Sequence, residues 1–491
     1  MGELWLYKVT MLVGRRAERV LLGEAMRSAE PELVAVYGRR RIGKTFLIRE
    51  FFGEAIAFEL TGSHAGDMKS QLDAFTTALG RATGTGLPLA TPASWADAFR
   101  LLEAHLKASR PAAGAGKRVV FLDELPWLAT RRSGFLAAFE HFWNGWASSQ
   151  EWLLVVICGS SASWMLRKVV KQRGGLHNRV TRRIRLEPFT LAETDAYLRS
   201  RDVDLGHYQT LELYMAFGGV PHYLKQARAG ESAAQAIERA CFTRDGLLRD
   251  EFEQLYASLF DRAERHEAVV RALAARRRGT TRGELLQAVG MVSGGTATKV
   301  LDELEESGFI ARSTPLGHDQ RDAVYRLADE YSLFYLTWIE KHRGRGEGAW
   351  QRKRASPRFR AWSGLAFESL CLKHVMSIKR ALGIAAVETE EAPWSHRPLD
   401  PDDEGAQVDL VIDRADRSTN LCEMKFSETD YVVDKGYAHA LERKRAVFRR
   451  ATGTRKTVFL TLVTTYGVKN NAHAQRLGLT TVTMDAFFGT P

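Results

Sequence analysis

The sequence predicts an α/β protein in which a parallel-sheet domain precedes smaller modules and a second α/β segment. An apolar run at residues 33–37 leads through a glycine-rich loop into a helical stretch, which is the order of a buried strand and its crossover helix. Residues 361–464 show the order helix, three strands, helix and strand. Because 491 residues exceed one ordinary hydrophobic core, we expect two to four domains.

The loop after the first strand carries the strongest motif. Residues Gly38 to Thr45 fit the phosphate-binding pattern G-x-x-x-x-G-K-[ST] without a mismatch. Glycines there let backbone N–H groups surround phosphates at a helix N-terminus, while Lys44 would reach the β- and γ-phosphates and Thr45 would hold Mg2+. The three arginines in the loop are compatible with solvation, phosphate binding or contact with a neighbouring subunit. The residues expected to bind ATP are Gly38, Arg39, Arg40, Arg41, Ile42, Gly43, Lys44, Thr45 and Phe46.

A second apolar strand, at residues 118–122, ends in the acidic pair Asp123 and Glu124. In a Mg2+-dependent NTPase, the first carboxylate orients the metal and its waters and the second polarises the attacking water. We therefore expect Asp123 and Thr45 to hold Mg2+. We expect Glu124 to act in catalysis together with Asp123 and Lys44.

Together with Val13-Gly14-Arg15 ahead of the loop, these motifs resemble the AAA+ ATPases. The resemblance implies that the preceding segment lies against adenine, and that Ser160 or Ser161, after the strand at 152–158, senses the γ-phosphate. It also implies a homo-oligomer in which an arginine before the last core strand, expected at 184–186, completes a neighbour's site. Arg179 is the first choice for that arginine, with Arg182 and Arg183 as alternatives.

Two later stretches extend the resemblance. Gly218-Gly219-Val220-Pro221 resembles the GxP element in the helical lid of STAND and Cdc6-like ATPases, which implies that Pro221 lies beside the nucleotide. Three helical patterns and two strands between 269 and 327 predict a winged helix. Its third helix carries acidic residues that would repel phosphates, so a lid or packing role competes with DNA reading. The basic run at 338–360 is typical of a solvated connector and also suits a phosphate backbone.

The C-terminal segment resembles the restriction-endonuclease-like PD-(D/E)xK fold. Its expected strands lie at 384–389, 407–413, 420–426 and 457–464, with helices at 361–382 and 435–450. Side chains alternate along a strand, so Glu423 and Lys425 share a face that Asp409 can join, with Glu368 in the preceding helix. Asp409 and Glu423 could hold Mg2+ or Mn2+, and Lys425 suits phosphodiester hydrolysis. Val408 replaces the Pro usual before Asp409, and surface salt bridges are the alternative explanation.

Composition narrows the partners and the compartment. The net charge of +11 favours a polyanionic partner, with DNA ahead of RNA and of membrane surfaces. Four scattered cysteines form no CxxC pair, which favours a reducing compartment. We see no apolar run long enough to span a bilayer and no secretion signal, so we expect a soluble cytoplasmic protein.

The whole chain resembles the archaeal-type STAND/AAA+ ATPases that carry a winged helix and a nuclease-like domain. We expect an ATPase whose nucleotide state gates a metal-dependent DNA nuclease. The alternatives are an ATP-dependent switch or scaffold with a non-catalytic recognition domain, and a winged-helix transcription regulator. The expected domains are an ATPase core at 1–188, a helical lid at 189–262, a winged helix at 263–340, a basic linker at 341–360 and a nuclease-like domain at 361–491.

Overall fold

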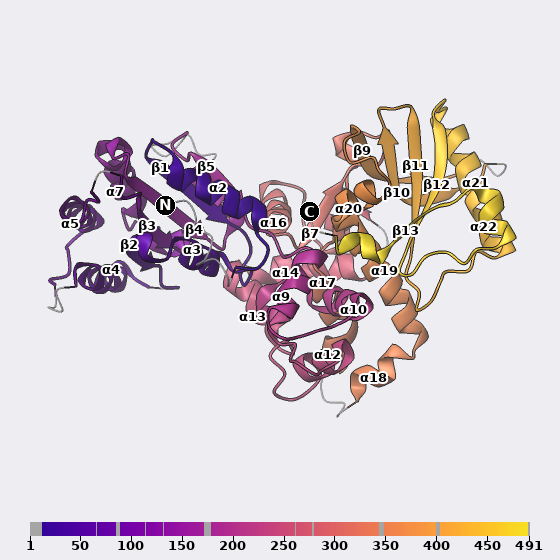
Figure 1. Cartoon of the computed structure of the whole chain (residues 1–491), viewed down its shortest axis with the longest axis horizontal. Coiled ribbons are helices and arrows are strands. Elements are labelled where there is room, and N and C mark those ends of the chain that lie inside the picture. Colours follow the sequence, from indigo (N-terminus) through magenta and orange to yellow (C-terminus); the bar gives the residue numbers. More distant parts are fainter. Residues whose placement is uncertain are drawn as a thin grey trace. The chain divides into compact units, whose positions relative to one another are not determined.

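The computed structural model divides the chain into two compact units, Met1–Pro188 and Phe189–Pro491 (Figure 1). It describes residues 12–64, 66–84, 89–112, 114–130, 132–170, 178–260, 262–276, 279–342, 348–398 and 403–489. No helix within these ranges is long and apolar enough to cross a lipid bilayer. All four cysteines are buried and unpaired, as expected from their spacing.

The first unit is built on a five-stranded parallel sheet, which confirms the expected fold class. The strand order is β2-β3-β4-β1-β5. Every residue of β1 is buried, and Val34 lies opposite Val156 of β4. The strands are β1 Glu32–Tyr37, β2 Ile56–Thr61, β3 Arg118–Asp123, β4 Leu153–Gly159 and β5 Arg182–Arg185.

Helices cover both faces of this sheet. Helices α2 (Arg16–Arg27) and α3 (Lys44–Phe52) share one apolar core with the strands. The other core is formed by α4 (Met68–Thr83), α5 (Trp95–Ala108) and α7 (Phe135–Gly145), of which α7 was not predicted. Short helices α6 (Leu125–Leu128) and α8 (Ala162–Met165) follow β3 and β4. Burial on both faces explains why β1, β3 and β4 are almost continuously apolar.

The last strand of this sheet starts earlier than predicted. We expected it at residues 184–186, but β5 begins at Arg182, which lies opposite Val34 of β1. Strand β5 is at the edge of the sheet, so charged side chains on its open face remain in solvent. The prediction was wrong because it relied on apolar character alone.

The second unit begins with helices. These are α9 Leu191–Arg199, α10 His207–Phe217, α11 Pro221–Leu224, α12 Ala233–Cys241 and α13 Glu251–Leu259. Capping boxes fix the starts of α9, through Thr190 and Glu193, and of α12, through Ser232 and Gln235. These five helices lie within the segment 189–262, for which helical structure was expected.

Three helices and a small antiparallel sheet follow. The helices are α14 Ala263–Ala274, α15 Arg282–Ala288 and α16 Gly295–Glu306, and the sheet has the order β6-β8-β7. Its strands are β6 Thr280–Thr281, β7 Ile310–Ser313 and β8 Val324–Leu327. These are the element types that the sequence predicts for this stretch.

The basic run at 338–360 differs from the solvated connector that we expected. Within its described part, helix α18 spans Ala349–Arg354 and α19 spans Pro357–Lys373, after α17 at Glu330–Phe334. Trp338 and Trp350 are buried in the unit's core, and Arg354 pairs with the buried Glu212 at 2.6 Å. Apolar side chains alternate with cationic ones in the described part of this run. The apolar side chains pack into the core, while the charged groups of the others form ion pairs or reach solvent.

The C-terminal part of this unit is a five-stranded mixed sheet. Strands β9, β10 and β11 are antiparallel, and β12 and β13 extend the sheet in parallel. Helices α21 and α22 share one apolar core with the strands, and α19 and α20 belong to the other (Figure 1). The elements are α20 Val375–Ala381, β9 Thr389–His396, β10 Ala406–Arg414, β11 Ser418–Lys425, α21 Lys435–Thr452, β12 Thr457–Thr464, α22 Ala472–Leu477 and β13 Thr480–Thr483.

Two predictions in this segment were wrong. The helix expected at 361–382 breaks at His374 into α19 and α20. The first strand, expected at 384–389, is β9, which starts only at Thr389. The apolar residues at 384–387 form a turn after α20, whereas β9 is an edge strand that tolerates Pro393.

Candidate functional site

The functional residues of the first unit meet at one edge of its parallel sheet. The loop Gly38–Gly43 follows β1, Asp123 ends β3, and Ser160 follows β4. Carboxyl ends of parallel strands lie at the same edge, which is where open α/β sheets bind ligands. Three segments distant in the sequence therefore converge there.

The backbone of the loop requires its glycines. Gly38 has φ 150°, and a Cβ atom on it would lie 2.2 Å from the carbonyl oxygen of Leu186. Gly43 has φ 90° and directly precedes α3, whose first N–H groups have no hydrogen-bond partner within the helix. Arg41 also has a positive φ, 71°. This is the curled backbone that a phosphate-binding loop needs.

Lys44 lies inside the loop that it is expected to serve. The side chain is buried, and its Nζ atom donates hydrogen bonds to the carbonyl oxygens of Gly38 and Arg39, both at 2.9 Å. The ammonium group is thus positioned where the loop would wrap a phosphate.

Thr45 and Asp123 form the pair that was predicted to hold Mg2+. The Thr45 hydroxyl donates to Oδ2 of Asp123 at 2.7 Å. Within the described ranges, no group of three or more His, Cys, Asp and Glu side chains could hold a metal ion. The pair nevertheless suits Mg2+, because this ion is usually bound by one or two carboxylates together with substrate phosphates and waters.

Glu124 is held by the residue after β4. Its Oε2 atom accepts hydrogen bonds from the Ser160 hydroxyl at 2.7 Å and from the Ser160 backbone N–H at 3.1 Å. Its own N–H donates to Oδ1 of Asp123 at 3.0 Å. The sequence left Ser160 and Ser161 as alternatives, and the contact with Glu124 is made by Ser160.

Arg15 is a contributor that sequence reasoning did not include among the site residues. Its side chain is buried and donates to the carbonyl oxygens of Glu187 at 2.6 Å and of Ile42 at 3.1 Å. It therefore connects the loop to the segment after β5. The signal was present, since an arginine follows Val13-Gly14 directly before a helix, but its partners are too distant in sequence to be inferred.

The other arginines of the loop differ in their surroundings. Arg39 is buried, whereas Arg40 lies over the Trp127 ring at 5.3 Å. Phe46 is 51% exposed on α3. Pro221 belongs to the second unit, where it is the first residue of α11. Two residues earlier, a glycine is required at Gly219, because a Cβ atom there would lie 1.9 Å from the carbonyl oxygen of Phe189.

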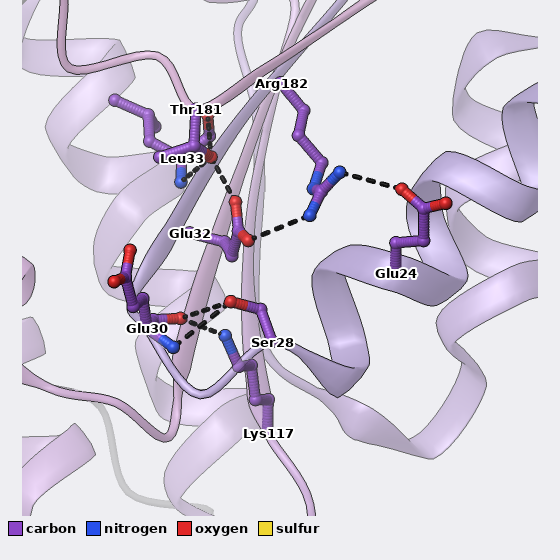
Figure 2. Close-up of polar contacts among 8 residues, drawn as sticks. All are labelled: Glu24, Ser28, Glu30, Glu32, Leu33, Lys117, Thr181 and Arg182. Carbon is purple, nitrogen blue, oxygen red and sulfur yellow. Dashed lines mark hydrogen bonds and ion pairs between the residues drawn. The ribbon is translucent and has the colours of Figure 1, made fainter.

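The three arginines considered for a neighbour's site also differ in their surroundings. Arg182 pairs with Glu24 at 3.0 Å and with the buried Glu32 at 3.3 Å (Figure 2). Thr181 bonds to the other oxygen of Glu32, and Lys117 donates to the Glu30 carbonyl nearby (Figure 2). Arg182 is therefore bound within its own chain. Arg179 and Arg183 are exposed.

The predicted C-terminal residues converge as well. Strands β10 and β11 are antiparallel with Leu410 opposite Cys422, so the next pair outward is Asp409 and Glu423. The register of β10 against β9 shifts between Val408 and Val411, a bulge of the kind that re-aims a side chain. Oδ2 of Asp409 accepts from the Met424 N–H at 3.0 Å.

Glu368 on α19 belongs to the same cluster. Burial, together with the nearby Asp409 carboxylate, raises the pKa of Glu368 to about 7 against the opposing effect of the Arg326 guanidinium. Arg326 comes from β8 and donates to the Ser369 hydroxyl at 3.3 Å. A carboxyl with such a pKa can carry a proton near neutrality.

Lys444 is the second residue that the sequence did not identify. Its Nζ lies 2.6 Å from Oε1 of Glu423, while Nζ of Lys425 lies 3.4 Å from Oε2. Lys425 also lies over the ring of Tyr437, at 5.5 Å. As folded, the C-terminal carboxylates do not fit a divalent metal, since ammonium groups neighbour both oxygens of Glu423 and the described residues include no three-ligand group.

Known proteins resemble this chain in sequence and in fold. Residues 12–227 match the family described as an ATPase domain predominantly from Archaea, and the match extends past the first unit through α11. An uncharacterised protein of Methanocaldococcus jannaschii, MJECL04, is 22% identical over 444 residues, which are 89% of this chain and 92% of that protein. The Walker-type ATPase PABY2304 of Pyrococcus abyssi is 19% identical, with a TM-score of 0.50 over 66% of this chain and 96% of its own.

The match over residues 12–227 thus supports an ATPase domain of archaeal type that binds a nucleotide. The likeness to the Pyrococcus abyssi protein is one of fold. The expected parallel sheet of the P-loop ATPase type is confirmed at this level.

Proposed function

We propose that this protein binds and hydrolyses ATP as a STAND/AAA+-type switch. The observation that carries the proposal is the hydrogen bond between Thr45 and Asp123, 2.7 Å long, beside Lys44 and Glu124 at one sheet edge. Four residue types that phosphoryl transfer requires come from two separate segments of the chain. A structural turn would not need all of them.

Each of these residues has a defined task. When ATP binds, the Lys44 ammonium group would give up its hydrogen bonds to the Gly38 and Arg39 carbonyl oxygens and bind the β- and γ-phosphates instead. Thr45 and Asp123 would hold Mg2+, which supplies charge neutralisation of the phosphate oxygens. Glu124 accepts hydrogen bonds from Ser160 and so is oriented to polarise a water against the γ-phosphate.

ATP turnover in the presence of Mg2+ tests this function. Glu124→Gln should bind ATP while losing about 10²- to 10⁴-fold in kcat, the usual contribution of a general base. Lys44→Ala should lose ATP binding, and Lys69→Ala, an exposed lysine on α4, should behave as wild type. Unchanged turnover in Glu124→Gln would remove this proposal.

The C-terminal cluster favours a second function, namely action on phosphodiesters of DNA or, as a weaker candidate, RNA. The supporting observation is that Asp409, Glu423 and Lys425 meet at neighbouring strand ends with Glu368 beside them. Glu368 would exchange a proton near neutral pH, and Lys425 would orient the scissile phosphate. Loss of cleavage in Asp409→Ala with unchanged DNA binding separates this function from a non-catalytic recognition domain.

The proposal also assigns roles to the segments after the ATPase core and to an oligomer. A nuclease-like domain at 361–491 would be gated by the nucleotide through the lid at 189–262 and the winged helix at 263–340. A homo-oligomer in the cytoplasm would use Arg179 or Arg183 at a neighbour's site, because both are exposed. A transcription regulator is disfavoured, since α16 carries Asp302, Glu303, Glu305 and Glu306.

A further inference from the structure

The buried carboxylate of Glu423 already has cationic partners. Only 3% of Glu423 is exposed, and the two ammonium groups beside it come from different elements, Lys425 from β11 and Lys444 from α21. The contact to Lys444 is the shorter, 2.6 Å against 3.4 Å. Lys444 therefore takes the position from which a cation would reach Glu423.

The position of Lys444 is set by its helix. An Asp434 side chain caps α21 by accepting from the Tyr437 N–H at 2.7 Å. On the same helix, Leu441 and Phe448 are buried in the core that α21 shares with the sheet. A helix anchored on both sides of Lys444 delivers its ammonium group to the strand ends in a fixed geometry.

The charges around Glu423 determine whether a divalent cation can bind there. Asp409 and Glu423, when ionised, carry two negative charges, and Lys425 and Lys444 carry two positive ones. A divalent cation approaching Glu423 meets two carboxylates whose charges two ammonium groups already balance, and it has to displace an ammonium group. Removing the Lys444 charge would leave a net negative site, which attracts a divalent ion.

We propose that Lys444 occupies the cation position of the C-terminal site, so that divalent metals bind there only after Lys444 is withdrawn. The inference rests on the proposed phosphodiester function for the use of such a metal. The occupancy itself rests on the ion pair between Lys444 and Glu423. A site of this kind stays closed until the position of α21 or of the Lys444 side chain changes.

Binding of Mn2+ to the full chain, followed by the electron spin resonance of the free ion, tests the proposal. Without nucleotide, Lys444→Met should bind one additional Mn2+ at least about tenfold more tightly than wild type, because a competing unit charge is gone. Adding Asp409→Asn to Lys444→Met should abolish that binding and so locate it. Arg443→Met is the matched control, since Arg443 is exposed on the same helix, and it should behave as wild type.

Other outcomes overturn the proposal. Wild type that binds Mn2+ in an Asp409-dependent manner as tightly as Lys444→Met would show that Lys444 is no barrier. Absence of the additional ion from Lys444→Met would show that no cation position exists there. If Lys444→Met does not fold, as judged by circular dichroism, Lys444→Gln and the charge-retaining Lys444→Arg replace it, and only Lys444→Gln should gain the ion.

The readout is independent of nuclease activity. If Lys444→Met gains Mn2+ and no nucleic acid is cleaved, the occupancy by Lys444 stands and the phosphodiester function fails. If wild type cleaves DNA while binding Mn2+ tightly through Asp409, the function stands and the occupancy fails.

Discussion

Glu124 has a backbone conformation that few residues other than glycine adopt, with φ 49° and ψ 50°. Such a conformation costs on the order of 1–3 kcal/mol and persists only where the surroundings fix it. Here the Glu124 N–H is bonded to Asp123, and its side chain accepts two bonds from Ser160. The conformation turns the carboxylate toward the end of β4, so that the acid after β3 and the hydroxyl after β4 act as a unit.

At this scale we predict that Ser160→Ala lowers kcat for ATP about tenfold, because one hydrogen bond to a charged group contributes about 1.5 kcal/mol. The backbone N–H of Ser160 still bonds to Glu124, so the loss is smaller than for Glu124→Gln. ATP affinity should change little, and steady-state turnover with equilibrium ATP binding measures both. Ser161→Ala is the control, and an equal loss of kcat in both variants would contradict the specific role of Ser160.

At the scale of elements, a histidine connects the end of α19 to the start of α9. Nε2 of His374 accepts the Leu191 N–H at 3.0 Å, and Nδ1 lies 2.8 Å from the Leu370 carbonyl, so the neutral ring carries its proton on Nδ1. Burial lowers the pKa of His374 to about 4, against an ordinary value of 6.5. The helix that carries Glu368 is thereby bonded to the first helix of the second unit.

We predict an acid-sensitive second unit. The pKa of His374 is depressed on folding, so the unfolded chain binds a proton below about pH 6.5 while the folded chain resists it down to about pH 4. Stability from this group is present above pH 6.5 and falls by about 3 kcal/mol as the pH falls to 4. Urea unfolding at pH 7 and pH 4.5 should show this loss in wild type, whereas His374→Gln should lose much less.

The control for that measurement is His439→Gln, because His439 is exposed on α21. It should retain the wild-type dependence on pH. If His374→Gln loses as much stability between the two pH values as wild type, the acid sensitivity comes from other groups.

The sequence predicts those features of the fold that depend on neighbouring residues. The loop at 38–45, the acidic pair after β3 and the strand β12 follow from local patterns, and the structure contains them with nearly the expected bounds. Arg15 and Lys444 were missed because each acts on a partner from another element. Strand β9 was misplaced because its residues, including Pro393, lack the apolar alternation that marks a half-buried strand.

At the scale of the whole molecule, the two candidate sites belong to two separate units. The nucleotide loop belongs to the first unit and the carboxylate cluster to the second, with the net charge of +11 favouring a polyanionic partner. One large apolar core includes buried residues from α9 and from α19 to one face of the C-terminal sheet. A change in the helices at 189–262 can therefore reach α19 and the carboxylates through packed side chains, which the proposed gating by nucleotide requires.

Cleavage of plasmid DNA with Mg2+ or Mn2+, with and without ATP, tests this central claim most directly. Wild type would be compared with Lys44→Ala, which removes the nucleotide contact, and with Asp409→Ala, which removes a C-terminal carboxylate. We predict that cleavage by wild type depends on ATP, that cleavage by Lys44→Ala does not depend on ATP, and that Asp409→Ala does not cleave DNA. Cleavage that is identical in all three proteins, or absent from all three while ATP is still hydrolysed by wild type and Asp409→Ala, would contradict it.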